Sequence, residues 1–243
     1  MKAPVRTHPT RLPSIEVSEK RGVRILHFSG GAAQSAMRVR DPIALELEYT
    51  RATLLFLLMH QAPRDLGLIG LGGGSIAKFI HHHLPQIRQT AVEIHPEVIG
   101  AARALFYLPA DDARLSVRCD DGAAWVAAQD QSLDVLIVDA YDQKRIVEAL
   151  ASEDFYHACH RALRPGGVAV FNLWAEAGRY HLYRERIEAA FGAPVLRLPV
   201  EQGGNVVTFA QRAPVTPTEN LAARLPEFAS LRLELADFIA RLR

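Results

Sequence analysis

Four carboxylates and one run of glycines are the residues of this chain best suited to bind a ligand or accept a proton. Glu93 closes a short apolar segment, and Asp121 follows a second one. Asp139 and Asp142 follow a third segment, and Gly70-Leu71-Gly72-Gly73-Gly74 ends a fourth. In open α/β sheets, ligands bind in the crevice outside the carboxyl ends of the strands. We therefore expect these residues to line one crevice.

The glycine run reads as a tight turn between a strand and a helix. Gly70, Gly72, Gly73 and Gly74 follow an apolar stretch, and a helix-like pattern begins at Ser75. Glycine allows positive φ and close approach of a ligand, and the first N–H groups of the helix face that ligand. No Gly-Lys-Ser/Thr follows, so a triphosphate is not expected. A turn that needs glycine only for steric reasons is the alternative.

Glu93 and Asp121 are placed to hold a nucleoside. Glu93 lies about 20 positions beyond the glycines, where nucleotide-binding α/β folds carry the carboxylate that accepts from the ribose hydroxyls. Asp121 opens a helix and can accept a hydrogen bond from an adenine amino group. Ile94 and Gly122 are their neighbours in the predicted pocket. These motifs alone also fit a binding site for a dinucleotide such as NAD. Asp139 and Asp142, which follow the third segment, disfavour a dinucleotide site.

Taken in order, several motifs resemble one family. They are Gly72-Gly73-Gly74, Val92-Glu93-Ile94-His95-Pro96-Glu97-Val98-Ile99, Phe106-Tyr107-Leu108-Pro109, Asp121-Gly122 and Val138-Asp139-Ala140-Tyr141-Asp142. This order resembles the polyamine aminopropyltransferases (spermidine synthases), which have the class I methyltransferase fold. The resemblance covers roughly residues 20 to 210. It implies that the donor is a sulfonium nucleoside, decarboxylated S-adenosylmethionine or S-adenosylmethionine itself, and that no metal is needed.

The resemblance also implies roles for individual residues. Glu93 would hold the ribose and Asp121 the adenine. Asp139 would take a proton from the attacking amine, and Asp142 would bind the amine substrate. Gln34 and Tyr141 would contact that substrate, Gln34 from an N-terminal hairpin.

The chain departs from the family pattern at three places. Ser75 stands where the family carries an aspartate that pairs with the ammonium of the donor arm. Gln143-Lys144-Arg145 replaces the family's Asp-Pro-x-Gly-Pro segment, and cations there would repel a polycationic acceptor unless they point away. Tyr49 lies several residues too far from Gln34 to match the family's acceptor-site tyrosine.

Three functions remain open on the sequence. The first is aminopropyl transfer from decarboxylated S-adenosylmethionine to a diamine or polyamine, which needs donor and amine held together and a carboxylate base. The second is methyl transfer from intact S-adenosylmethionine, with the Ser75 hydroxyl next to the carboxylate of the donor. The third is a non-catalytic nucleotide-binding module. The presence of both Asp139 and Asp142 disfavours this third function.

The surrounding pattern predicts how these residues are positioned. Alternating β and α segments indicate an α/β, Rossmann-like methyltransferase fold with a seven-stranded, mostly parallel sheet and helices on both faces. Strands are expected near 66–71, 89–94, 114–119, 133–138, 167–173, 194–199 and 205–210, and helices near 74–84, 96–106, 121–129, 152–163 and 178–191. Short strands near 15–17, 23–28 and 35–39 suggest a small antiparallel β-hairpin appendage, and 43–60 suggests one helix.

The predicted division places a tail and β appendage at 1–42, a catalytic domain at 43–212 and a C-terminal helical tail at 213–243. We expect the tail to pack on the domain or on a second subunit, so a homodimer is possible.

Composition narrows the class of partner. The chain has 243 residues, is 49% hydrophobic and carries a formal net charge of +1. No basic cluster interleaves with aromatics and no apolar run approaches membrane-spanning length, so neither nucleic acid nor membrane is expected as a partner. Cys119 and Cys159 are expected as reduced thiols of a cytoplasmic protein. The expected partner is a small-molecule amine acceptor.

Several residues that suggest chemistry are better explained by structure. Consecutive histidines at 81–83 point about 100° apart on a helix and cannot close around one metal ion. Glu46 and Glu48 are expected on a charged helix face, and Lys78 as an ordinary helix cation. Trp125 is expected in the core, with a wall of the adenine pocket as the alternative.

Overall fold

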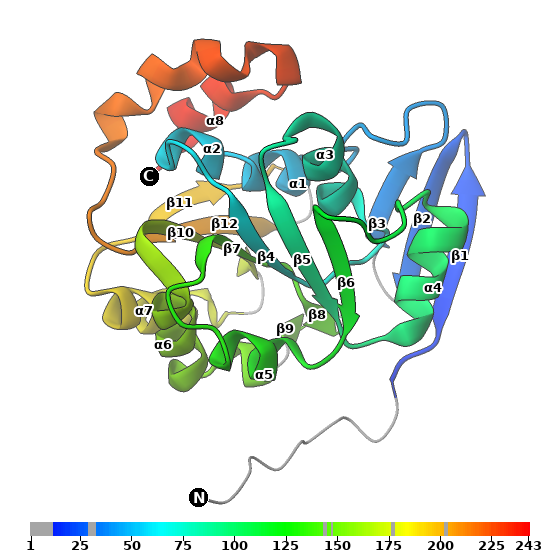
Figure 1. Cartoon of the computed structure of the whole chain (residues 1–243), viewed down its shortest axis with the longest axis horizontal. Coiled ribbons are helices and arrows are strands. Elements are labelled where there is room, and N and C mark those ends of the chain that lie inside the picture. Colours follow the sequence, from blue (N-terminus) through cyan, green and yellow to red (C-terminus); the bar gives the residue numbers. More distant parts are fainter. Residues whose placement is uncertain (1–11, 29–32, 143–144, 147, 176–177, 202–203) are drawn as a thin grey trace, which may run out of the picture.

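A seven-stranded sheet forms the centre of the molecule (Figure 1). The computed structural model describes residues 12–28, 33–142, 145–146, 148–175, 178–201 and 204–243. The strands are β4 (Asp65–Ile69), β5 (Arg88–Glu93), β6 (Leu115–Cys119), β7 (Leu133–Val138), β10 (Leu163–Trp174), β11 (Leu196–Pro199) and β12 (Asn205–Gln211). Their order is β11-β12-β10-β7-β4-β5-β6, and all neighbours are parallel except at β12, which runs antiparallel to both β10 and β11. The seven predicted strands and the predicted fold class are confirmed.

Helices cover both faces of this sheet because its strands are apolar on both sides. Val135 and Ile137 of β7 point into one core, and Leu136 and Val138 into the other. The helices are α3 (Ser75–His83), α4 (Pro96–Leu105), α5 (Gly122–Ala127), α6 (Glu153–Ala162) and α7 (Tyr180–Phe191). The first core includes residues of α3, and the second is shared with α5, α6 and α7, which group together in Figure 1. The alternation of strand side chains therefore builds a three-layer domain.

The N-terminal appendage contains the three short strands that the sequence predicts. β1 (Ile15–Lys20), β2 (Val23–Phe28) and β3 (Ala33–Arg38) form an antiparallel sheet in that order. Leu26 and Met37 from this sheet pack with Val98 and Phe106 from α4 and its end. Because β3 also contacts α3, the appendage lies against both α3 and α4. A further two-stranded ribbon joins β8 (Tyr141–Asp142) to β9 (Arg145–Ile146).

The single helix predicted for 43–60 is wrong. The structure has α1 (Glu48–Thr53) and α2 (Phe56–Met59), separated by a turn with i→i−3 bonds from Leu54 to Arg51 and from Leu55 to Ala52. Every residue from Leu54 to Met59 is buried, so the segment is packed on all sides rather than along one stripe. A helical period cannot describe such a segment.

Glu48 is also not part of an exposed charged face. It is 8% exposed, its Oε1 pairs with Arg241 Nη2 at 2.7 Å, and its Oε2 accepts from the Glu201 N–H at 3.0 Å. Glu46 pairs with Arg38 at 2.6 Å. Glu48 thus ties α1 to the C-terminal helix and to the segment before β12.

The C-terminal tail packs on the domain, as predicted. It consists of η3 (Thr218–Asn220), η4 (Ala222–Leu231) and α8 (Leu235–Arg241), of which the first two are 3-10 helices. Leu221, Leu235 and Phe238 enter the first core. Arg224 donates to the carbonyls of Leu57, Leu58 and His60 at the end of α2. The boundaries after residues 42 and 212 stay predictions.

Lys78 differs most from its prediction. Its side chain is 1% exposed, and its Nζ donates to the Phe106 carbonyl at 2.6 Å beside the Met37 sulfur at 3.1 Å. In the described part of the chain it forms no ion pair with a carboxylate. Burial lowers the pKa of this amine from 10.5 to about 8. The appendage that covers α3 turns a helix cation into a buried amine.

The buried amine predicts an alkaline gain in stability. Between pH 8 and 10.5 the unfolded chain keeps its proton at Lys78 while the folded chain loses it, so unfolding becomes less favourable as pH rises. Relative to Lys78→Met, the wild type should gain up to about 3 kcal/mol of unfolding free energy across this window. Urea denaturation at pH 7 and pH 10.5 measures the difference, with Lys20→Met at an exposed lysine as control. A difference between wild type and Lys78→Met that is the same at both pH values would contradict the prediction.

Candidate active site

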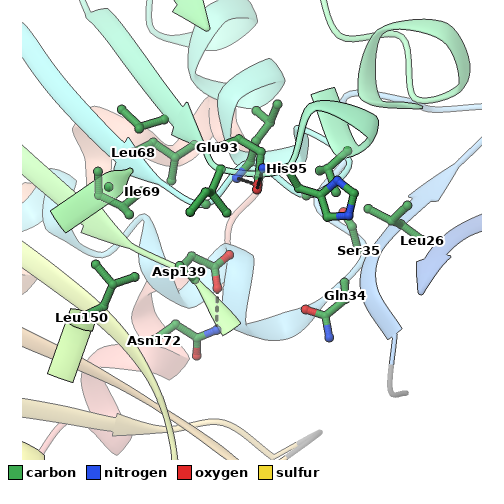
Figure 2. Close-up of a pocket in the computed structure, with 18 of the residues that line it drawn as sticks. Leu26, Gln34, Ser35, Leu68, Ile69, Glu93, His95, Asp139, Leu150 and Asn172 are labelled. Carbon is green, nitrogen blue, oxygen red and sulfur yellow. Dashed lines mark hydrogen bonds between the residues drawn. The ribbon is translucent and has the colours of Figure 1, made fainter. Parts of the chain in front are cut away.

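A cavity of about 790 Å³ opens at the carboxyl ends of the parallel strands. Ile69 of β4, Glu93 of β5, Asp139 after β7 and Asn172 of β10 line it. Gln34 of β3 faces it from the opposite side (Figure 2). The crevice expected from strand ends is therefore closed on one side by the N-terminal appendage.

The glycine run divides into two groups. Gly70 and Gly72 line the cavity with φ of +89° and +52°. Gly73 and Gly74 are not among the lining residues: a Cβ on Gly73 would lie 2.8 Å from Phe106 Cδ1, and one on Gly74 2.8 Å from Leu108 Cδ1. Packing explains the lack of a side chain at Gly73, and packing together with a φ of +73° explains it at Gly74. This is the steric alternative for half of the run.

Ser75 begins α3 at the cavity wall. It is 7% exposed, its Oγ lies 3.5 Å from Ser35 Oγ, and it donates to the Ala36 carbonyl at 3.4 Å. Gly72 lies against the same Ser35 side chain. Two neutral hydroxyls therefore occupy the corner where the resemblance implies an aspartate.

Glu93 holds the loops on either side of it. Its Oε2 accepts from the Leu71 N–H at 3.0 Å, and its Oε1 accepts from the His95 N–H at 3.0 Å. Each carboxylate oxygen has a second lone pair that a ribose hydroxyl can use. Ile94 lines the cavity beside it. Glu93 thus supports the glycine loop in addition to any contact with a ligand.

Asp121 caps the helix that starts at Gly122. Its Oδ1 accepts from the N–H groups of Ala123 and Ala124 at 2.8 and 3.1 Å, which are bonds typical of an N-cap aspartate. Both bonds end on the same oxygen, so Oδ2 is the one suited to accept from a ligand. Asp121 and Gly122 both line the cavity, and a Cβ on Gly122 would lie 2.4 Å from Ile69 Cγ2.

Asp139 is the best candidate for a base. Its Oδ1 accepts from Asn172 Nδ2 at 2.8 Å, and the Tyr49 hydroxyl also donates to its carboxylate. Burial in the fold raises the pKa of this carboxyl to about 6, the two hydrogen bonds act in the opposite direction, and the Glu93 charge adds to the rise. A carboxyl with this pKa is ionised at neutral pH and can accept a proton.

Tyr49 lies at the site despite its distance from Gln34 in sequence. Both line the cavity, and the Tyr49 hydroxyl is 3.5 Å from the Gln34 carbonyl oxygen. The segment between β3 and α1 brings the tyrosine back to the appendage. Tyr141 and Asp142 form β8, and their side chains lie outside the described part of the structure, as do residues 143 and 144.

Sequence reasoning missed Asn172, Asn205 and His95. Asn172 lies near the carboxyl end of an apolar strand, so the strand-end rule that found Asp139 applies to it as well. Asn205 begins an antiparallel strand, and its place at the same edge follows only from the pairing of β12 with β10. His95 Nε2 lies 2.6 Å from the Pro13 carbonyl and holds the N-terminal segment at the cavity wall.

The lining is anionic. Its carboxylates are Glu93, Asp121, Asp139 and Glu148, and the described lining residues include no lysine or arginine. Such a lining favours cationic ligands.

The other suspected features lie elsewhere. Trp125 is partly buried, packs against the second core beside Gly67 and lines a separate cavity of about 290 Å³, not this one. His81 Nε2 lies 2.9 Å from Asp112 Oδ2. Within the described ranges, no group of three or more His, Cys, Asp and Glu residues is arranged to hold a metal ion. None of the described helices is long and apolar enough to cross a membrane.

Comparison with known proteins gives one consistent family. The spermine/spermidine synthase domain matches residues 52–187, more than half of the chain. A polyamine aminopropyltransferase of Chromobacterium violaceum is 40% identical over 242 residues, which cover 98% of this chain and 93% of that protein.

Two solved structures share the fold. A probable spermidine synthase from Corynebacterium glutamicum aligns with a TM-score of 0.72 at 23% identity, covering 87% of this chain and 83% of that one. A spermidine synthase in complex with the transition state analogue AdoDATO aligns with a TM-score of 0.70 at 22% identity, covering 93% and 83%. With the family match and the relative that is similar along nearly its whole length, the chain belongs to the spermine/spermidine synthase family and is an aminopropyltransferase.

Proposed function

We propose that the chain transfers the aminopropyl group of decarboxylated S-adenosylmethionine to an amine of a diamine or polyamine. The observation that carries this proposal is the Asp139 carboxyl, with its pKa of about 6, in a cavity whose described lining has four carboxylates and no lysine or arginine. Both the sulfonium donor and the amine acceptor are cations, and the carboxylates favour both.

The proposed reaction is an in-line displacement. The lone pair of the amine nitrogen forms a bond to the carbon next to sulfur, the carbon–sulfur bond breaks, and methylthioadenosine leaves. The amine must lose a proton to have that lone pair, and Asp139 accepts it. Holding the two substrates in line lowers the barrier by several kcal/mol, as for other oriented bimolecular reactions.

The residues divide between the two substrates. We assign Glu93 with Ile94 to the ribose, Asp121 with Gly122 to the adenine, and Gly70 and Gly72 to the close approach of the donor. Ser75 lies where the donor arm would end. Gln34, Tyr141 and Asp142 are assigned to the acceptor. Tyr49 and Asn172 join them because both donate to the Asp139 carboxylate.

The test is product formation with two donors. We expect decarboxylated S-adenosylmethionine to give an aminopropylated product with putrescine or spermidine, together with methylthioadenosine, by mass spectrometry. Calorimetry with each donor shows which form binds more tightly. Accumulation of S-adenosylhomocysteine with some other acceptor, and no modified amine, would favour methyl transfer instead.

Ser75→Asp tests which donor the pocket selects. The added carboxylate restores a counter-charge for the ammonium of the decarboxylated donor and repels the carboxylate of the intact one. We expect the affinity of the Ser75→Asp protein for the decarboxylated donor to rise about tenfold. Its affinity for the intact donor should fall by a similar factor. Ser75→Asn introduces a side chain of the same shape as aspartate but without its charge, and it is the control. Equal effects of the two substitutions on both donors would show that charge is not involved.

Glu93→Ala tests the nucleoside end. Loss of hydrogen bonds to a charged group is expected to weaken methylthioadenosine binding by about 1–3 kcal/mol. Because Glu93 also holds the Leu71 and His95 N–H groups, the melting temperature should fall as well. Glu97→Ala, at an exposed glutamate of α4, is the matched control. An unchanged dissociation constant in a folded Glu93→Ala protein would remove Glu93 from the donor site.

A further inference from the structure

We infer that Asn205 is a positioning residue of the reaction: it fixes the orientation of the Asn172 amide, which in turn holds the Asp139 carboxylate as proton acceptor. The inference rests on the proposed function and adds a residue that does not itself contact Asp139. It concerns a chain of two side-chain amides that starts on the antiparallel strand β12 and ends at the proposed base.

Two hydrogen bonds link the side chains of Asn205, Asn172 and Asp139. Asn205 Nδ2 donates to Asn172 Oδ1 at 2.9 Å, and Asn172 Nδ2 donates to Asp139 Oδ1 at 2.8 Å. In the register of β10 and β12, Asn205 is opposite Trp174 and Asn172 is opposite Val207, so the two asparagines are diagonal neighbours on adjacent strands. Asn172 is 6% exposed, and all three residues of the chain line the cavity. Figure 2 shows the Asn172 amide turned toward Asp139.

The orientation of the two amide groups follows from the carboxylate of Asp139, to which they lead. An ionised carboxylate only accepts, so Asn172 must present its NH2 group to Asp139. The Asn172 carbonyl then faces the other way and needs a donor, which Asn205 supplies. Turned over, the Asn172 amide would place its oxygen against the carboxylate and its NH2 group against the NH2 group of Asn205. Asn205 therefore makes the donating orientation of Asn172 the stable one.

This orientation affects the charge state of Asp139. Tyr49 from α1 and Asn172 from β10 donate to its carboxylate, while Glu93 from β5 raises its pKa through charge. Asp121 and Glu148 are further acids on the same cavity. Without a fixed Asn172, Tyr49 is left as the donor to a carboxylate surrounded by other acids. The ionised form is then less stable, and protonation should occur at higher pH.

Two substitutions separate orientation from charge. Asn205→Leu removes the donor at similar volume without adding charge. Asn205→Asp replaces the donor by an acceptor that also carries charge. We expect the acid limb of kcat/KM to move upward by about 1 pH unit in Asn205→Asp and by a smaller amount in the same direction in Asn205→Leu. A 1-unit shift corresponds to a rate about tenfold lower at pH 5, and the deficit should disappear by pH 8.5.

Thr208→Val is the matched control on the same strand. Thr208 is fully buried and bonds to the Tyr180 hydroxyl at 3.3 Å, away from the amide chain. Loss of its hydroxyl should leave the acid limb in place. A shift in Asn205→Asp with none in Asn205→Leu would mean that added charge alone acts, and the inference would be wrong.

A second measurement does not depend on turnover. The carboxyl carbon of Asp139, identified by its loss from the spectrum of Asp139→Asn, can be titrated by ¹³C NMR in wild type and both variants. We expect its midpoint to rise in Asn205→Leu and Asn205→Asp. If wild type makes no aminopropylated amine, the proposed function fails while this titration still decides the role of Asn205. If wild type makes product and neither the midpoint nor the acid limb moves, the inference alone is overturned.

Discussion

Replacing Asp139 by asparagine is expected to lower turnover by at least about 100-fold while methylthioadenosine binding stays nearly unchanged. The side chain keeps its size and can still bond to its neighbours, but an amide cannot take the proton of the attacking amine. The loss therefore belongs to the chemical step and appears in kcat. Initial rates with decarboxylated S-adenosylmethionine and putrescine, together with calorimetry of methylthioadenosine, measure the two quantities separately.

The same residue predicts the pH profile of the wild type. The pKa of Asp139 is raised to about 6, so its carboxyl is ionised above that value and protonated below it. The value of kcat/KM should therefore fall as pH drops through about 6, and this limb should be absent in Asp139→Asn. Asp130→Asn, at an exposed aspartate, is the control and should keep both the rate and the limb. A variant of Asp139 with at least half of the wild-type turnover would exclude it as the base.

Gly70→Ala is expected to have the largest effect on stability, with a loss of about 3 kcal/mol or more. Gly70 has a φ of +89°, a conformation that is unfavourable for alanine, and an added Cβ would lie 2.1 Å from the Asp139 carbonyl oxygen. That oxygen belongs to the backbone, so the overlap can be relieved only if the strand ends after β4 and β7 move apart. The movement would also displace Asp139, and activity should fall with stability.

Gly100→Ala is the matched control for this substitution. Gly100 lies within α4, and nothing lies within 4 Å of an added Cβ. Alanine there should leave the protein as stable as the wild type or stabilise it by up to about 1 kcal/mol. Urea denaturation compares the three proteins. A Gly70→Ala protein as stable as the wild type would show that the turn can relax without cost, and the close approach of β4 and β7 would have no structural importance.

The candidate donor site was predictable because its residues follow a local rule. Glu93, Asp121 and Asp139 each lie at or just after a strand end, and parallel strands bring their carboxyl ends to one edge. The structure places all three on the same cavity. Asn172 obeys the same rule and could have been found with it. Roles in binding and catalysis remain predictions for each of them.

Residues that reach the site from other layers could not be found in this way. Tyr49 is too far from Gln34 along the sequence to match the family pattern, but both line the cavity because the segment between β3 and α1 returns to it. Asn205 reaches the carboxyl edge from the start of a strand, because β12 runs opposite to β10. The positions of Tyr49 and Asn205 in the sequence do not indicate that either residue reaches the cavity.

The sequence by itself determined the order along the chain of the seven sheet strands and of the helices α3 to α7, together with the crevice and the carboxylates along it. It could do so because period, turn glycines and strand ends are local properties. The tertiary structure alone decided which of these groups touch. It buried Lys78 under the appendage and packed Phe106 and Leu108 against Gly73 and Gly74. It also gave the Asp139 carboxylate its hydrogen-bond donors. The reason is physical: burial, hydrogen-bond partners and the pKa of a carboxyl depend on what other layers bring to it, and no local pattern records that.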